Sequence, residues 1–328
     1  MFASNARVDA LSFPVIDFYP GAKFKLALEG SFPANTDMTF RAVALGLLFV
    51  LIWSSAFTSG KFIVADAPPI TFLAIRFFLS GGIGIALAFC LGERINLTRQ
   101  QLFAVVVFGI CQNALYLGLN FVAFQWVDAS IAVVISSLLP IAVGLSGWLF
   151  LGERLAWLGI AGLALGLIGS GIVLSARLEA GADIWGILLC ILGVLALTVA
   201  TLTVKTLAAS GNILMMVGLQ MLVGAVVLAP VGFMLETWDV TWSRTLITAF
   251  IYTTFFPGLF ATWIWFKLLE QVGATKAATF HFLNPFFGVV VAWVLLGEQI
   301  TKPDLVGVVF IMAAILAVQM STFLKTQA

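Results

Sequence analysis

Long apolar stretches separated by short polar segments recur ten times between residues 41 and 324. Their apolar positions do not alternate with polar ones, so they do not indicate half-buried strands. Crossing a hydrocarbon core of about 30 Å takes about 20 apolar residues, and a helix satisfies its own backbone there. The pattern therefore predicts ten transmembrane helices, near residues 41–63, 69–91, 101–124, 129–151, 156–176, 184–206, 212–235, 245–269, 275–297 and 304–324.

The composition agrees with this pattern. Hydrophobic residues make up 62% of the chain and charged residues 9%, whereas soluble domains have about half and about a quarter. The formal net charge of +1 gives no bulk attraction to nucleic acid. We therefore expect an all-α integral membrane protein whose partners are the lipid bilayer and a small-molecule substrate, with no nucleic acid.

Residues 1–37 differ from the rest of the chain. They contain three prolines and scattered charges, and no apolar stretch of signal-peptide length. Met38 directly precedes the first long apolar run. We expect residues 1–37 to be a disordered tail or the product of an over-extended translation start.

The loops predict how the chain is oriented. Ten spans joined by short connections alternate in direction, so both termini lie on one side of the membrane. Eight Lys and Arg residues fall on that side and four on the other, which favours cytoplasmic termini. The first group is Arg41, Arg94, Arg99, Arg154, Lys205, Lys267, Lys276 and Lys325, and the second is Lys61, Arg177, Arg244 and Lys302.

The chain also contains an internal repeat. The segment from Pro140 to Leu151-Gly152-Glu153 matches the segment from Pro285 to Leu296-Gly297-Glu298, at an offset of 145 residues. The interpretation is a duplication with halves at 38–182 and 183–328, each carrying five spans. Because five is odd, the second copy would be inserted upside down, and such inverted repeats are common in alternating-access carriers.

These features resemble the EamA-type bacterial members of the drug/metabolite transporter superfamily. The resemblance rests on Trp53-Ser54-Ser55-Ala56-Phe57 running on to Lys61, on Arg76, and on the repeated proline to Leu-Gly-Glu segment. It implies ten helices as two inverted five-helix repeats, a central cavity between the repeats, and cytoplasmic termini in a bacterial inner membrane. Many relatives export amino acids or other small metabolites.

Polar residues in the third span are candidates for substrate binding. Gln112, Asn113, Tyr116 and Asn120 recur at spacings of three and four residues, which places them on one face of a helix. That face turns either to a cavity or to a neighbouring helix. Trp53 in the first span is a candidate aromatic wall, although apolar packing explains it equally well.

Three further candidates surround the repeated prolines. His281 is paired by the repeat with Ser136, and Asn284 directly precedes Pro285. A proline inside a span bends the helix and frees a carbonyl, so Pro140 and Pro285 are expected to bend their helices near a cavity. The alternative is that His281 and Asn284 only bond a neighbouring helix.

Arg76 lies deep in the second span, and an offset of 144 pairs it with Gln220. Three roles are open to it: reaching the membrane interface, bonding carbonyls at a helix end, or meeting an anionic group of the substrate.

The chain is expected to be a transporter and not an enzyme, with no cofactor and no metal. Its cysteines, Cys90, Cys111 and Cys190, lie inside apolar runs without ligand spacing, and no phosphate-binding loop motif occurs. The predicted site lies against the third, fourth, eighth and ninth helices. The oligomeric state, monomer or homodimer, stays open.

Two alternatives accompany this prediction. One is a channel or a non-transporting structural membrane protein. The more remote one is an intramembrane serine protease, because Gly144-Leu145-Ser146-Gly147 has the GxSG form and His281 could serve Ser146 as a base.

Overall fold

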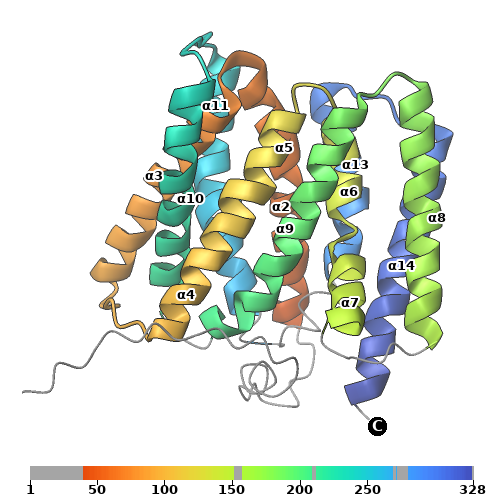
Figure 1. The fold of residues 1–328 in the computed structure, drawn as a ribbon, viewed down its shortest axis with the longest axis horizontal. Helices are drawn as coiled ribbons and strands as arrows, with labels where there is room; N and C mark the ends of the chain where they lie inside the picture. The colour runs from red at the N-terminus through yellow and green to blue at the C-terminus, as the bar shows by residue number, and fades with distance from the viewer. Residues whose placement is uncertain (1–39, 151–156, 209–211, 269–270, 272–279, 327–328) are drawn as a thin grey trace, which may run out of the picture.

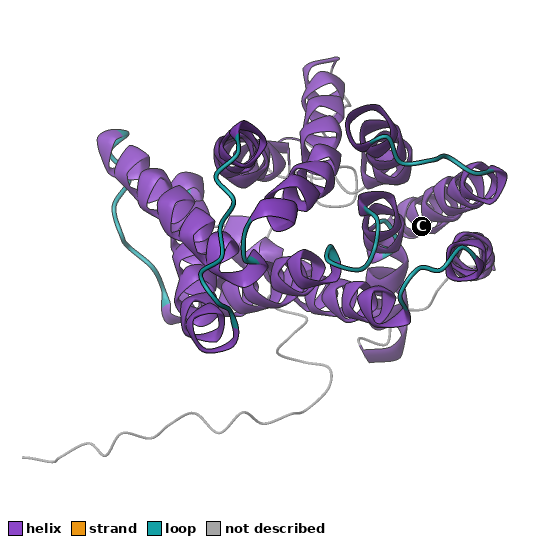
Figure 2. Cartoon of the chain, turned by 90° about the horizontal axis from the view of Figure 1, so that it is seen from above, coloured by secondary structure: helices purple, strands orange, loops and turns teal. Residues whose placement is uncertain are grey.

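A computed structural model describes residues 40–150, 157–208, 212–268, 271 and 280–326. All regular elements in these ranges are helices, and they form one bundle (Figure 1). Seen from above, many helices point along the line of view and no strand is drawn (Figure 2). The prediction of an all-helical fold is confirmed for the described part of the chain.

The first half of the chain contains α2 (Phe40–Asp66), α3 (Pro69–Cys90), α4 (Arg99–Phe108), the π-helix η1 (Gly109–Leu117), α5 (Gly118–Ala123), α6 (Ala129–Ser136), α7 (Leu139–Phe150) and α8 (Trp157–Glu179). The second half contains α9 (Ile184–Ala208), α10 (Ile213–Leu235), α11 (Arg244–Thr253), the π-helix η2 (Thr254–Phe260), the 3₁₀ helix η3 (Phe280–Leu283), α13 (Asn284–Leu296) and α14 (Lys302–Thr326). An α-helix at 261–268 follows η2 directly.

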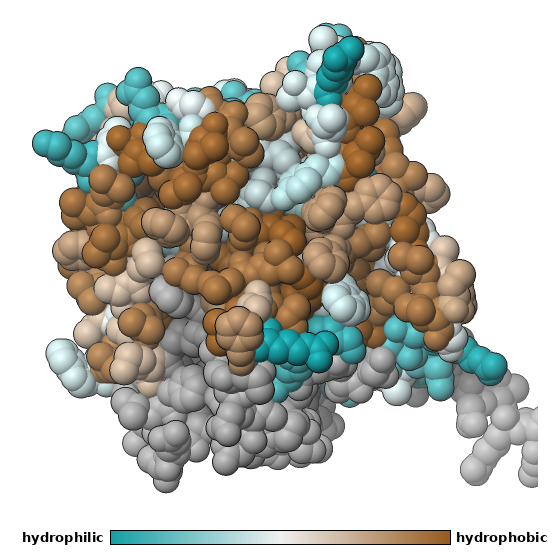
Figure 3. Space-filling model, turned by 180° about the vertical axis from the view of Figure 1, so that it is seen from behind, coloured by the Kyte–Doolittle hydropathy of each residue, from teal (hydrophilic) through white to brown (hydrophobic). Residues whose placement is uncertain are grey.

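Within the described ranges, eight helices are long and apolar enough to cross a membrane, and they coincide with the first eight predicted spans. The predicted span at 275–297 begins among residues outside the described ranges, and its described part includes the 13-residue α13. The predicted span at 304–324 falls within the 25-residue α14. Figure 3 shows apolar side chains over the middle of one face and polar side chains at both ends, as a bilayer requires.

Two helix pairs lie on opposite sides of the bundle, left and right in Figure 1: α3 packs on α10, and α8 packs on α14. Both pairs approach closely at glycines. A Cβ on Gly81 would lie 2.9 Å from the Gly218 oxygen, and one on Gly307 would lie 2.7 Å from the Gly169 oxygen. Small residues at these crossings therefore let the backbones approach, as is common in membrane helix pairs.

The helical irregularities follow the offset seen in the sequence. η1 and η2 begin at Gly109 and Thr254, and α7 and α13 begin at Leu139 and Asn284, so both pairs stand 145 residues apart. Pro140 and Pro285 are each the second residue of a helix; α7 follows a turn at residues 137–138, and α13 follows η3 directly. This position suits proline, whose missing N–H would have no partner in the first turn.

Candidate functional site

A cavity lies beside the two π-helices. Its walls come from α2, α3, η1, α5, α10, η2 and the helix that follows η2. Its volume is about 30 Å³, whereas a cavity that admits benzene measures about 150 Å³. A π-helix has a widened turn and often occurs at a functional site. The lining residues are Trp53, Ala56, Phe57, Arg76, Phe77, Gln112, Asn113, Tyr116, Leu117, Asn120, Phe121, Phe124, Met221, Pro257, Gly258 and Thr262.

Five of the eight sequence-predicted binding residues line this cavity: Trp53, Gln112, Asn113, Tyr116 and Asn120. The other three, Ser136, His281 and Asn284, are buried but do not line it. Phe57, Phe77, Pro257 and Gly258 also line the cavity, and none of them was predicted from the sequence as a binding residue. Pro257-Gly258 inside an apolar span is the one local signal that could have drawn attention to η2.

The polar stripe of the third span has two roles. The Asn113 amide donates to the Gln220 carbonyl oxygen at 2.8 Å and also to the Gln220 side chain, which ties η1 to α10. The Asn120 amide donates to the Tyr116 carbonyl at 2.7 Å. Asn120 Oδ1 and Gln220 Nε2 are buried without a partner among the described residues. The stripe therefore both joins helices and leaves unsatisfied polar atoms near the cavity.

His281 and Asn284 form a separate polar pair behind the cavity wall. His281 Nδ1 lies 2.9 Å from the Asn284 side-chain nitrogen. The imidazole meets the rings of Phe49 and Trp265 edge-on, and Phe49 also contacts Trp53. His281 is thus one aromatic ring away from a cavity-lining residue.

Ser136 and Ser146 lie outside the cavity wall. Ser136 lies next to Tyr116, without completing a hydrogen bond of normal geometry. No contact joins Ser146 to His281 among the described residues, so nothing in them favours a protease. Nor do they contain a group of three His, Cys, Asp or Glu residues that could hold a metal ion.

Arg76 is the charged residue of the cavity wall. Its exposed fraction is 4%, and its guanidinium carbon lies 5.1 Å from the centre of the Phe77 ring. Its Nε is buried without a hydrogen-bond partner, and neither ion pair of the described residues includes it. Because a charge deep in a membrane costs about 3 kcal/mol on insertion scales, an unpaired one calls for an explanation.

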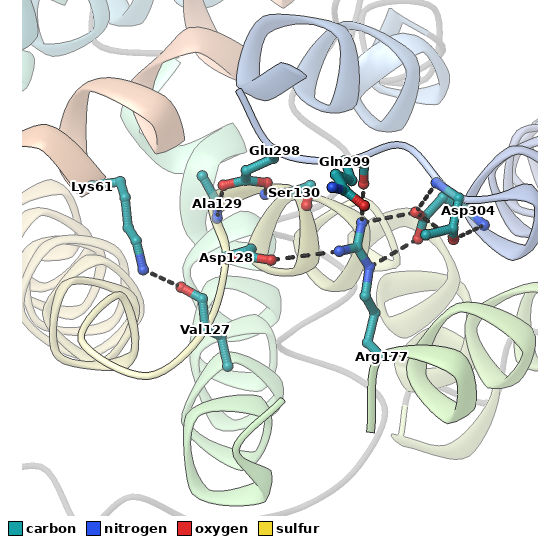
Figure 4. Close-up of polar contacts among 10 residues, drawn as sticks. Lys61, Val127, Asp128, Ala129, Ser130, Arg177, Glu298, Gln299 and Asp304 are labelled. Carbon is teal, nitrogen blue, oxygen red and sulfur yellow. Dashed lines mark hydrogen bonds and ion pairs between the residues drawn. The ribbon is translucent and has the colours of Figure 1, made fainter. Parts of the chain in front are cut away.

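A second group of charges lies at the end of the bundle that is uppermost in Figure 1, and Figure 4 shows its contacts. We call it the polar cluster, and it consists of Lys61, Asp128, Arg177, Glu298 and Asp304. Arg177 donates to both Asp304 oxygens, from Nε at 3.0 Å and from Nη2 at 2.8 Å. It also reaches Asp128 at 3.4 Å.

Glu298 in the polar cluster caps a helix of the other half. Its carboxylate accepts from the backbone N–H groups of Ala129 at 2.8 Å and Ser130 at 3.1 Å, at the start of α6. Gly297 (φ +69°) ends α13 in a left-handed conformation that suits glycine. The Leu-Gly-Glu segment therefore ends one helix and stabilises the N-terminus of another.

Lys61 of the polar cluster binds backbone carbonyls at the C-terminal end of a helix. Its ammonium donates to the Phe124 carbonyl at 2.6 Å and to the Val127 carbonyl at 2.7 Å, just beyond the end of α5. A cation at carbonyls that follow a helix is favourable.

Two further glutamates cap helices across the halves. Glu236 accepts from the N–H groups of Ile70 and Thr71, at 2.8 and 2.7 Å. Glu93 accepts from the N–H of Met215 at 2.9 Å. Glu236 follows α10 and caps the N-terminus of α3, and Glu93 follows α3 and caps the N-terminus of α10. The sequence showed these glutamates without indicating what they bind.

Comparison with known proteins gives a family match. The model of the EamA-like transporter family matches this chain twice, at residues 40–175 and 184–320. The uncharacterized transporter YvbV of Bacillus subtilis is 25% identical over 84% of this chain and 90% of its own length. YoaV of the same species is 24% identical over 86% and 97%.

Two other similarities are more limited. An S-adenosylmethionine/S-adenosylhomocysteine transporter of Chlamydia trachomatis is 28% identical, over 39% of each chain. One solved structure, described only as a protein, superposes with a TM-score of 0.64 at 20% identity over 87% of this chain and 99% of that one. It supports the fold alone.

Proposed function

Because the chain belongs to the EamA-like transporter family, we propose that it exports small amphipathic metabolites, such as amino acids, from a bacterial cell by alternating access. The observation that carries this proposal is the cavity itself. It joins unsatisfied polar atoms to aromatic walls, which suits a substrate with a polar end and an apolar body.

We further propose ten spans arranged as two inverted repeats. The 145-residue offset of the π-helices and of the helices that carry Pro140 and Pro285 supports a duplicated unit. The pairing of α3 with α10 and of α8 with α14 brings two helices against their counterparts in the other half, as a two-fold axis between the halves would. Five spans per unit would give the two units opposite orientations.

Alternating access would use the two ends of the bundle differently. With a volume of about 30 Å³, the cavity is too small for a metabolite, so the helices around it would have to move apart. At one end the polar cluster ties the halves together through Arg177, Asp304 and Glu298 (Figure 4). Opening at that end would break these contacts, and their re-formation would close it.

The substrate site in this proposal comprises the five cavity residues Trp53, Gln112, Asn113, Tyr116 and Asn120. His281, Asn284 and Ser136 would join it when the helices move, since His281 contacts Phe49 next to Trp53, Asn284 contacts His281, and Ser136 lies next to Tyr116. The bacterial inner membrane and cytoplasmic termini are part of the proposal. α2 begins and α14 ends at the same end of the bundle (Figure 1), which supports termini on one side.

Flux into proteoliposomes tests the function. The purified full-length chain should give saturable uptake of a radiolabelled apolar amino acid and discriminate between its L and D forms. Flux that rises linearly with concentration would indicate a channel, and absence of flux for every metabolite in a broad panel would refute transport. A screen for resistance to toxic amino acid analogues in overproducing cells would supply the panel, because an exporter protects against its own substrate.

A further inference from the structure

We propose that Arg76 binds the carboxylate of the transported substrate, so that the substrates are organic acids with an apolar body. This inference rests on the proposed transport function and adds the chemical group that the site selects. Of the three roles open to Arg76 from the sequence, the geometry favours one.

Arg76 reaches neither the interface nor a helix-end carbonyl. With an exposed fraction of 4% it does not extend to the surface. No hydrogen bond from its guanidinium to a carbonyl occurs among the described residues, and Nε is without a partner. The described ion pairs both belong to Arg177. What remains is a planar set of donors in the wall of a cavity, and a carboxylate matches that geometry with two parallel hydrogen bonds.

Gly258 in η2 lies beside the guanidinium. A Cβ at Gly258 would lie 3.6 Å from Arg76 Nη2 and 3.3 Å from Ser80 Oγ. Glycine at this position therefore places no side chain against Arg76 and Ser80, and the preceding Pro257 also lines the cavity.

A second unsatisfied atom, which belongs to another residue of the cavity wall, favours a substrate with a hydrogen-bond donor. Asn120 donates its amide to the Tyr116 carbonyl, which can only accept, so the free atom is the acceptor Oδ1. Trp53, Phe57 and Phe121 supply apolar walls. An apolar α-amino acid presents all three features: a carboxylate for Arg76, an ammonium for Asn120 and an apolar side chain.

The test compares an acid with its amide. Binding to the detergent-purified full-length chain is followed by its thermal unfolding with L-phenylalanine, 3-phenylpropanoate, L-phenylalaninamide or sodium sulfate. We expect both carboxylates to bind at least about tenfold more tightly than the amide, and L-phenylalanine to bind most tightly. Arg76→Gln should abolish this preference. Arg76→Lys should keep part of it, because lysine keeps the positive charge but lacks the two parallel donors of the guanidinium. The exposed Arg94 gives the matched control, Arg94→Gln.

Several results would overturn the inference: equal binding of acid and amide, no binding of either carboxylate, a preference retained in Arg76→Gln, or sulfate binding as tightly as the carboxylates. The comparison of acid with amide in the unaltered chain holds even if a variant does not fold. Flux separates this inference from the proposed function. Carboxylates that bind without being transported would refute transport alone, whereas saturable flux of the amide with equal preference would refute the role of Arg76 alone.

Discussion

Two arginines are buried among the residues that the structure describes, Arg76 and Arg177, and their surroundings differ. Arg177 has an exposed fraction of 9% and binds Asp304 through two donors, with Asp128 and the Gln299 carbonyl as further partners. Arg76 is buried more deeply and has neither an acidic nor a carbonyl partner among the described residues. Burial alone therefore does not assign a role to a charge. The partners of the guanidinium separate a structural arginine from one that can accept a ligand.

The same difference extends beyond the arginines. Glu93, Glu236 and Glu298 each accept from helix N-termini, so these carboxylates stabilise the fold. Two of the residues that line the cavity, Arg76 and Asn120, each have a buried polar atom without a partner in the described structure. Since unsatisfied buried polar atoms are costly, their presence at one cavity favours a polar occupant there.

The largest predicted effect follows from breaking the pair of Arg177. Asp304→Ala removes a carboxylate with a 1% exposed side chain and leaves Arg177 without its main partner. We expect the free energy of unfolding to fall by about 3–5 kcal/mol, measured by denaturant unfolding in detergent. Asp128→Ala is the matched control, because that side chain is 47% exposed and lies 3.4 Å from Arg177; its loss should cost less than about 1 kcal/mol. Equal effects of the two substitutions would contradict the central role of Asp304.

Crowding the cavity is expected to have the next largest effect. The Cβ of Gly258→Ala would lie 3.0 Å from the Thr253 carbonyl oxygen and close to Ser80 and Arg76. We expect a loss of about 1–3 kcal/mol in stability together with reduced substrate flux. Gly82→Ala is the control, since a Cβ there meets nothing within 4 Å. If Gly258→Ala transports as well as Gly82→Ala, the space beside Arg76 is not used.

The caps between the halves should contribute less. Glu298→Gln keeps an acceptor for one N–H at the start of α6 but removes the negative charge, so stability should fall by about 1 kcal/mol. Glu179→Gln provides the comparison, because Glu179 is exposed at the end of α8, where a negative charge gives no stabilisation. Thermal unfolding in detergent measures both. A neutral Glu298→Gln would mean that water replaces the carboxylate without loss.

Local patterns predicted the helices better than they predicted the contacts between them. The second span, expected at 69–91, is observed at Pro69–Cys90, because the length of an apolar run and its flanking polar residues are local signals. The pairing of Arg177 with Asp304 joins residues 127 positions apart, and the loop count treated Arg177 only as a charge at a span end. The order of helices around the bundle is not contained in hydrophobic periodicity.

The cavity illustrates the same limit. The site was expected against the third, fourth, eighth and ninth helices, whereas the cavity is lined by the first, second, third, seventh and eighth spans. The spacing of the third-span stripe indicated a shared face, which the structure places in the cavity wall. The widened turn of η1 has no local signal, since Gly109–Leu117 reads as an ordinary apolar helix with polar positions.

The substitution predicted to cause no loss of stability sharpens the comparison most. Arg76→Met replaces an unpaired buried charge by an apolar side chain of similar length. Because no partner is left behind, we expect the unliganded protein to be unchanged or stabilised by up to about 1–2 kcal/mol. Arg177→Met should instead destabilise by several kcal/mol, since it leaves the buried Asp304 without its cation. Denaturant unfolding of both variants without substrate decides the matter: a loss for Arg76→Met as large as that for Arg177→Met would mean that Arg76 already has a structural partner, and the reason to place a carboxylate beside it would disappear.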